Sequence, residues 1–196
     1  MRRFDRLWRP IAVFGIFALA ACTSLSLDTA AKLRALDYLN DDIASLVLAF
    51  DVPETIEPVA DGSTLSFDIA TPGKGERHIK AVLTHTDAGE VAGSLPPPAG
   101  ERTYYLFGFS DADKTALREA QAWARTLPAG NNSLAISLAP RFCRTAAVDP
   151  GQVRVSVLVA LPGATSLAPL INGETLANLL AQSPEKDLPE CAGHSG

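Results

Sequence analysis

The stretch Val153–Ala160, VRVSVLVA, contains the clearest strand pattern in the chain. Valine occupies every second position from Val153 to Val159, while Arg154 and Ser156 fall on the other parity. Successive side chains of a strand point to opposite faces, so this alternation predicts a strand with one face in a core and the other toward solvent. Such strands are typical of antiparallel sheets, which are often covered on one face only.

Strand patterns recur along the chain on both sides of this stretch. They fall at 43–50, 64–69, 77–86, 103–109, 134–138 and 167–171. Turn signals such as Pro72-Gly73 and Pro150-Gly151, rather than helices, separate most of them. The pattern predicts a mainly β fold, an antiparallel β-sandwich of six or seven strands.

Two finer expectations concern the strands nearest to Val153–Ala160. The strand at 134–138 can continue to Cys143, and we expect it to form a hairpin with the valine-rich strand. The strand at 167–171 is expected at an edge of the sheet, with Asn172-Gly173 ending it.

A helical pattern interrupts the strands after residue 109. Ser110 and Asp113 have the spacing of a capping box, with Asp in place of the usual Glu. Apolar residues then recur every three to four positions as far as Leu127, before Pro128. We expect one helix inserted among the strands, and a β-α-β unit over 103–138 is the alternative arrangement of this region. Short terminal helices are expected at Asp28–Leu39 and Glu174–Leu180.

The N-terminal stretch Met1–Cys22, MRRFDRLWRPIAVFGIFALAAC, differs from the rest of the chain. Four arginines precede an uninterrupted apolar run from Ile11 to Ala21. This run is too short to span a hydrocarbon core, which needs about 20 helical residues. A charged region, a short apolar region and small residues at its end are typical of an export signal.

The last four residues of that stretch, Leu19-Ala20-Ala21-Cys22, resemble the lipobox of bacterial lipoproteins. The resemblance covers residues 1–22 only, and it implies that the Cys22 sulfur carries the lipid anchor after cleavage. Thr23 rather than Asp follows Cys22, which implies the outer membrane with the body in the periplasm, although inner-membrane anchoring stays open. The alternative is cleavage by ordinary signal peptidase without lipidation.

This reasoning predicts the domain organisation. We expect a signal peptide at 1–21, a lipidated tether at 22–27, a single β-sandwich-like domain at 28–182 and a polar C-terminal tail at 183–196. Removal of the signal, with its four Arg and one Asp, changes the net charge from −5 to −8. An acidic body argues against nucleic acid as a partner.

The chain has three cysteines, Cys22, Cys143 and Cys191. An odd thiol is unusual in an exported protein, and lipidation of Cys22 leaves an even pair. We expect Cys143 and Cys191 to form a structural disulfide in an oxidising compartment. The alternative is a redox or metal-binding pair, although no Cys-x-x-Cys spacing is present.

Catalytic motifs are absent from the sequence, which contains no nucleophile elbow, zinc-protease motif or phosphate-binding loop. His85 and Asp87 share a strand parity and are the weak candidates for a base and its orienting group. No metal-ligand set and no cofactor motif is present in the sequence.

Three functions are therefore open, of which a non-catalytic binding or scaffolding module for another envelope protein is favoured. The alternatives are an envelope hydrolase that uses His85 and a carrier of small apolar ligands. The carrier would need a pocket between the sheet and the inserted helix, lined by residues such as Tyr105, Phe107 and Trp123.

Overall fold

The computed structural model describes residues 37–71, 75–127, 133–183 and 187–192. The strands in this part are β1 (Val47–Pro53), β2 (Ile56–Pro58), β3 (Thr64–Thr71), β4 (Gly75–His85), β5 (Arg102–Phe109), β6 (Ser133–Ala139), β7 (Phe142–Arg144), β8 (Arg154–Ala160) and β9 (Ala168–Thr175). The helices are α2 (Gly89–Ala92), α3 (Asp111–Arg125) and α4 (Leu176–Gln182), with 3-10 turns η1 (Ile43–Ser45) and η2 (Ala60–Gly62). No helix of this part is both long enough and apolar enough to cross a membrane.

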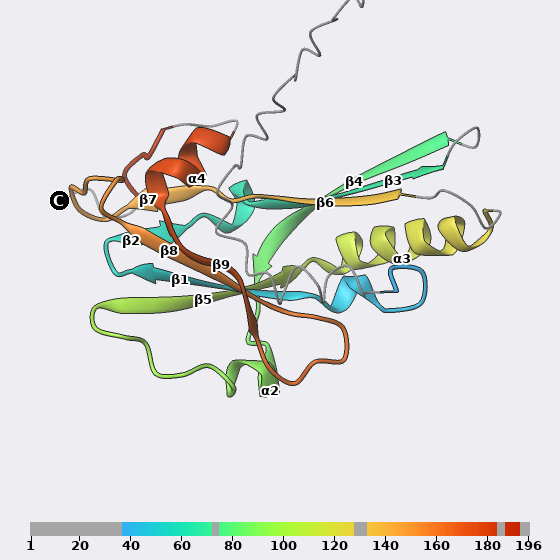
Figure 1. The fold of residues 1–196 in the computed structure, drawn as a ribbon, viewed down its shortest axis with the longest axis horizontal. Helices are drawn as coiled ribbons and strands as arrows, with labels where there is room; N and C mark the ends of the chain where they lie inside the picture. The colour runs from blue at the N-terminus through green and yellow to red at the C-terminus, as the bar shows by residue number, and fades with distance from the viewer. Residues whose placement is uncertain (1–36, 72–74, 128–132, 184–186, 193–196) are drawn as a thin grey trace, which may run out of the picture.

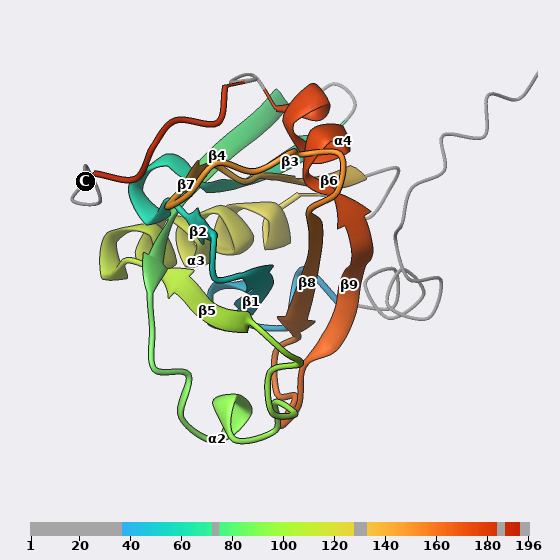
Figure 2. The same cartoon turned by 90° about the vertical axis from the view of Figure 1, so that its left-hand side faces the viewer.

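Seven of the described strands form one antiparallel sheet in the order β6-β3-β4-β5-β1-β8-β9, and β2 and β7 form a second, small sheet. The long strand β4 joins two parts of the large sheet, because it pairs with β3 over most of its length and with β5 only at Leu83–His85. Figures 1 and 2 show the large sheet curling between these parts into a half-barrel. The predicted mainly β, antiparallel fold is confirmed, whereas the division into the two sheets of a sandwich is not confirmed.

The expected hairpin between 134–138 and 153–159 is wrong. β6 pairs with β3, whereas β8 pairs with β1 and β9 on the other side of the sheet. The buried Pro140 follows β6, and the next residues leave the large sheet to form β7 against β2. The predicted alternation is nevertheless confirmed for β8, because Val155 and Val157 are completely buried.

Several element boundaries differ from the predicted ones. The chain at Ile43–Ser45 forms η1, so β1 begins only at Val47. β9 lies at an edge as expected but continues through Asn172-Gly173, because Gly173 adopts a positive φ of 66° within an irregular pairing with β8. The expected helix at 28–39 lies mostly outside the described residues, and its described end forms a turn in which the Asn40 amide donates to the Asp37 carbonyl at 2.9 Å.

The inserted helix α3 is confirmed, with Ser110 as its N-cap. The Asp113 amide donates to the Ser110 hydroxyl oxygen at 3.1 Å. α3 packs beneath β3 and β4, where Ala120 and Ala124 contact Ile69 (Figure 1). The alternative β-α-β unit is not formed, since β4 and β3 lie between β5 and β6 and the alternating pairing makes β5 and β6 antiparallel.

The core of the half-barrel is aromatic at the end that the small sheet covers. Phe50 on β1 contacts Phe107 on β5 and Phe142 on β7, with ring centroids 5.4 Å and 6.1 Å apart. All three rings are at most 2% exposed. The small sheet therefore closes one end of the core, while α3 covers the face of the sheet at the other end.

Candidate functional site

The edge strand β6 is the most unusual surface of the described part of the chain. β6 is hydrogen-bonded to β3 on one side, and it is the first strand in the sheet order, so no described strand pairs with its outer side. Ala135, Ile136 and Ser137 at its centre are exposed. Ile136 is the one large hydrophobic side chain that is exposed among the described residues, at 37%.

The sequence of β6, SLAISLA, contains no charged residue and no proline. Natural edge strands are usually protected by charges, prolines or bulges, because an unpaired edge readily pairs with another strand. The pairing of β6 with β3 is also regular, with no register shift from Ser133 to Ala139. β6 therefore lacks the ordinary features that prevent edge-to-edge pairing.

An apolar groove lies between this edge and the opposite edge strand β9. Its volume is about 280 Å³. The side chains that line it are all aliphatic and come from the segment before β1 and from β1, β3, β6, β8 and β9: Leu46, Leu48, Leu65, Ile136, Leu138, Val159, Leu170 and Ile171. The curl of the sheet thus leaves an apolar opening between its two free edges, and its walls can contact an apolar side chain or acyl group.

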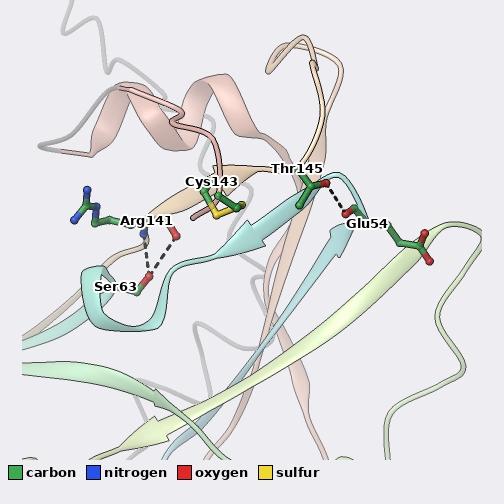
Figure 3. Close-up of a disulfide and its surroundings, with 6 residues drawn as sticks. Glu54, Ser63, Arg141, Cys143 and Thr145 are labelled. Atoms are coloured by element: carbon green, nitrogen blue, oxygen red, sulfur yellow. Dashed lines mark hydrogen bonds between the residues drawn. A yellow bond between two sulfur atoms is a disulfide. The ribbon is translucent and has the colours of Figure 1, made fainter. Parts of the chain in front are cut away.

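The disulfide lies on the segment that follows β6. Cys143 and Cys191 lie at bonding distance, with sulfur atoms 2.05 Å apart (Figure 3). The Cys191 amide donates to the Arg144 carbonyl at 2.9 Å, so the residues before and at Cys191 lie beside β7. The expected pairing of these cysteines thus links the chain after β6 to the chain after α4.

A buried serine holds the same segment from the other side. Ser63 is completely buried, and its hydroxyl donates to the Val59 carbonyl at 2.8 Å. The same hydroxyl accepts from the Arg141 amide at 2.9 Å (Figure 3). Glu57 lies beside the disulfide, and the three side chains are close enough together to hold a metal ion. Because the disulfide leaves no thiolate, this cluster offers a metal only one carboxylate.

The catalytic candidates His85 and Asp87 are not assembled into a catalytic site. His85 is exposed, and its ring lies 4.7 Å from the ring of Phe107. It borders two depressions, one that also contains Asp87 and one that also contains Ser45. The Ser45 hydroxyl donates to the Asp42 carbonyl at 2.7 Å, and among the described residues no hydrogen bond joins His85 to a serine or to Asp87.

The side chains proposed for a carrier pocket do not meet around one cavity. Phe107 is part of the closed core. Tyr105 borders the depression beside Asp87, where burial, with smaller contributions from Glu57 and Glu54, raises its pKa. The guanidinium of Arg77 lies over the ring of Trp123 on α3, with the Arg77 Cζ atom 4.7 Å from the ring centroid. The groove that the structure contains lies elsewhere, between β6 and β9.

The lipidation candidate Cys22 lies outside the described residues. Sequence reasoning also missed the β6 edge and the groove, although the uncharged pattern SLAISLA was a usable signal for the edge. Comparison with known proteins finds no matching family model, no matching curated protein and no matching solved structure.

Proposed function

We propose that this chain is a lipid-anchored binding or scaffolding module of a bacterial cell envelope. In this proposal residues 1–21 direct export, the lipid on Cys22 attaches the protein to the outer membrane, and the body faces the periplasm. The lipobox-like ending Leu19–Cys22 supports the anchor. The single observation that supports binding is the apolar groove beside the unprotected strand β6, because such openings on a protein surface mark interaction sites.

The anchor is tested by replacing Cys22 with Ser in the full chain and fractionating the cells. We expect the variant to move from the membrane fraction to the soluble periplasmic fraction. Retention in the membrane would contradict lipidation at Cys22, and Thr23→Ser, at the next residue, serves as the control for a substitution beside the lipidation position.

The binding role is tested by chemical crosslinking in intact cells, followed by recovery of the tagged protein and identification of what is attached. We expect one envelope component to be recovered reproducibly with the wild type. Leu170→Lys, which places a charge on the half-buried wall of the groove, should reduce its recovery at least tenfold. Ala122→Lys, at an exposed position on α3, should not change it.

A carrier of small apolar ligands is the second candidate, and the aliphatic lining of the groove favours it. Lipid extraction of the purified protein and mass spectrometry would then find a stoichiometric apolar ligand in the wild type and not in Leu170→Lys. A hydrolase is not proposed, since the described residues around His85 form no base–nucleophile pair.

A further inference from the structure

No described strand pairs with the outer side of β6, and the sequence of β6 is compatible with one particular partner. Two β6 strands can pair in antiparallel orientation with Ile136 at the centre. A residue that precedes position 136 in one copy then lies opposite the residue that follows position 136 by the same number of positions in the other copy. Ile136 then lies opposite Ile136 of the second copy, and position 134 lies opposite position 138 in the register. The small residues also match, with serine facing alanine at the remaining positions, 133 with 139 and 135 with 137.

This arrangement is self-complementary in side-chain size. Residues directly opposite in an antiparallel pair lie on the same face of the sheet, so Ile136 and Leu138 of both copies share one face and the small residues share the other. In the pairing of β6 with β3, Ile136 lies opposite the buried Phe67. A second β6 would therefore extend the apolar face across the edge and cover the exposed part of Ile136.

The charge pattern is equally compatible with a second copy. A two-fold axis brings a charged residue near the centre of the strand close to the identical charge of the partner, which is unfavourable. β6 has no charged residue at all, whereas the body as a whole is acidic. Because the strand avoids the charge that dominates the rest of the molecule, it is the edge at which two copies can meet without repulsion at the contact.

Figure 1 shows β6, together with β3 and β4, extending beyond α4 and β9 to the far end of the molecule. The groove separates β6 from the other free edge, β9, and both Ile136 and Leu138 line it.

We propose that β6 pairs in antiparallel orientation with β6 of a second copy, centred on Ile136, to form a two-fold symmetric dimer with a continuous sheet. This inference rests on the proposed function in assigning a docking role to the same edge, and it identifies the partner there as a second copy of this chain. Anchoring of both copies to one membrane would raise their local concentration and favour the pairing.

Cysteine crosslinking of the full chain tests the register directly. Lipidation removes the thiol of Cys22 and the disulfide removes those of Cys143 and Cys191, so an introduced cysteine is the one free thiol. Ile136→Cys places two thiols opposite each other, and mild oxidation of membranes should convert most chains into a covalent dimer on non-reducing gels.

The matched control is Ser133→Cys on the same strand. In the proposed register residue 133 of one copy lies opposite residue 139 of the other. The two copies of residue 133 are therefore six residues apart along the strands, which is about 20 Å. A disulfide needs Cα atoms within about 7 Å, so Ser133→Cys alone should give at least tenfold less dimer. Combination of Ser133→Cys with Ala139→Cys should restore the dimer.

Equal crosslinking of Ile136→Cys and Ser133→Cys overturns the inference, as does crosslinking of Ile136→Cys to a different protein.

Light scattering of the detergent-solubilised wild type should also give the mass of a dimer. The variant Ile136→Lys should give the mass of a monomer with an unchanged circular dichroism spectrum. A monomeric wild type overturns the dimer, while recovery of an envelope component that depends on Leu170 would leave the proposed function standing. Failure to recover an envelope component from a wild type that is still dimeric would contradict the proposed function and leave the dimer standing.

Discussion

The two free edges of the half-barrel, β6 and β9, differ in almost every feature that controls strand pairing. β9 contains Pro169 and Glu174 and has two register shifts against β8, with Gly173 at positive φ. β6 contains no proline, no charge and no register shift. Both edges border the same apolar groove, so the difference does not follow from their surroundings. It indicates that the chain protects one edge from pairing and leaves the other available.

The comparison also separates residues that maintain the fold from residues that form the edge. Phe67 and Ile136 lie opposite each other on β3 and β6, yet Phe67 is completely buried and Ile136 is 37% exposed. The inner member of the pair belongs to the core of one molecule. The outer member remains partly uncovered, and this is the feature that a docking strand would use.

The largest expected effect is on the inner member of that pair. Phe67→Ala should lower the free energy of unfolding by about 3–5 kcal/mol, because it leaves a cavity in the core beside Phe109. Ile136→Ala should lower it by about 1 kcal/mol in the monomer, since part of the side chain is already exposed. Urea unfolding monitored by circular dichroism measures both, and equal costs would show that β6 is as much a part of the core as β3.

Removal of the disulfide should have the next largest effect on stability. The bond closes a loop across a sequence separation of 48 residues, and Cys143→Ala with Cys191→Ala should cost about 2–4 kcal/mol. The bond fixes the segments that follow β6 and α4, so its loss should also increase hydrogen exchange in β7 more than in β4. Reduction of the wild type with dithiothreitol should reproduce the loss, whereas a reduced wild type with unchanged stability would contradict it.

A smaller effect is expected from removing a protective feature of β9. Pro169→Thr adds an N–H group and a β-branched side chain to that edge, so it should accelerate self-association, measured by static light scattering. Its effect on the free energy of unfolding should stay within about 0.5 kcal/mol. Pro97→Thr, in an exposed loop, is the matched control and should not associate faster. Identical behaviour of the two variants would mean that Pro169 does not protect β9.

The smallest effect concerns a charged pair far from both edges. Arg118 on α3 donates to both carboxylate oxygens of Asp42, at 2.8 Å and 3.1 Å, and this hydrogen bond is the main cause that lowers the pKa of Asp42. Because the pKa of Asp42 is lower in the folded state than in the unfolded state, the ionised carboxylate stabilises the fold at pH values above the unfolded-state pKa, which is near 4. This stabilisation is lost as the pH falls through the pKa of the folded state. Because both side chains are about half exposed, the contribution should be below about 1 kcal/mol.

The variant Asp42→Asn tests that sign. It should be slightly less stable than the wild type at pH 7, and this difference should disappear as the pH falls through the lowered pKa of the folded state, as measured by thermal unfolding at several pH values. The effects of Phe67→Ala and Ile136→Ala involve no titrating group and should not change over the same range. A difference for Asp42→Asn that grows as pH falls would contradict the assignment.

Local features of this protein could be predicted from its sequence, because they depend on residues close together in the chain. The parity of Leu65, Phe67 and Ile69 predicts the buried face of β3, and all three are at most 4% exposed. The Ser110 cap predicts the start of α3. The cysteine count predicts the pair that the structure brings to bonding distance.

The partners of the strands could not be predicted in the same way. The alternation in 134–138 shows that a strand forms but not that β3, rather than the valine-rich β8, lies beside it. That choice depends on Pro140, on the departure of β7 and on the curl of the whole sheet. The groove was missed for the same reason, since its lining comes from strands that lie far apart in the sequence.

The link between Cys143 and Cys191 also determines what a protease can do to this molecule. β8, β9 and α4 all lie inside the loop that this bond closes. The exposed turn between β8 and β9, at residues 163–166, is the natural place for a single cut. After such a cut the two fragments remain covalently joined, so the nicked protein keeps both edges of its sheet on one body until the bond is reduced.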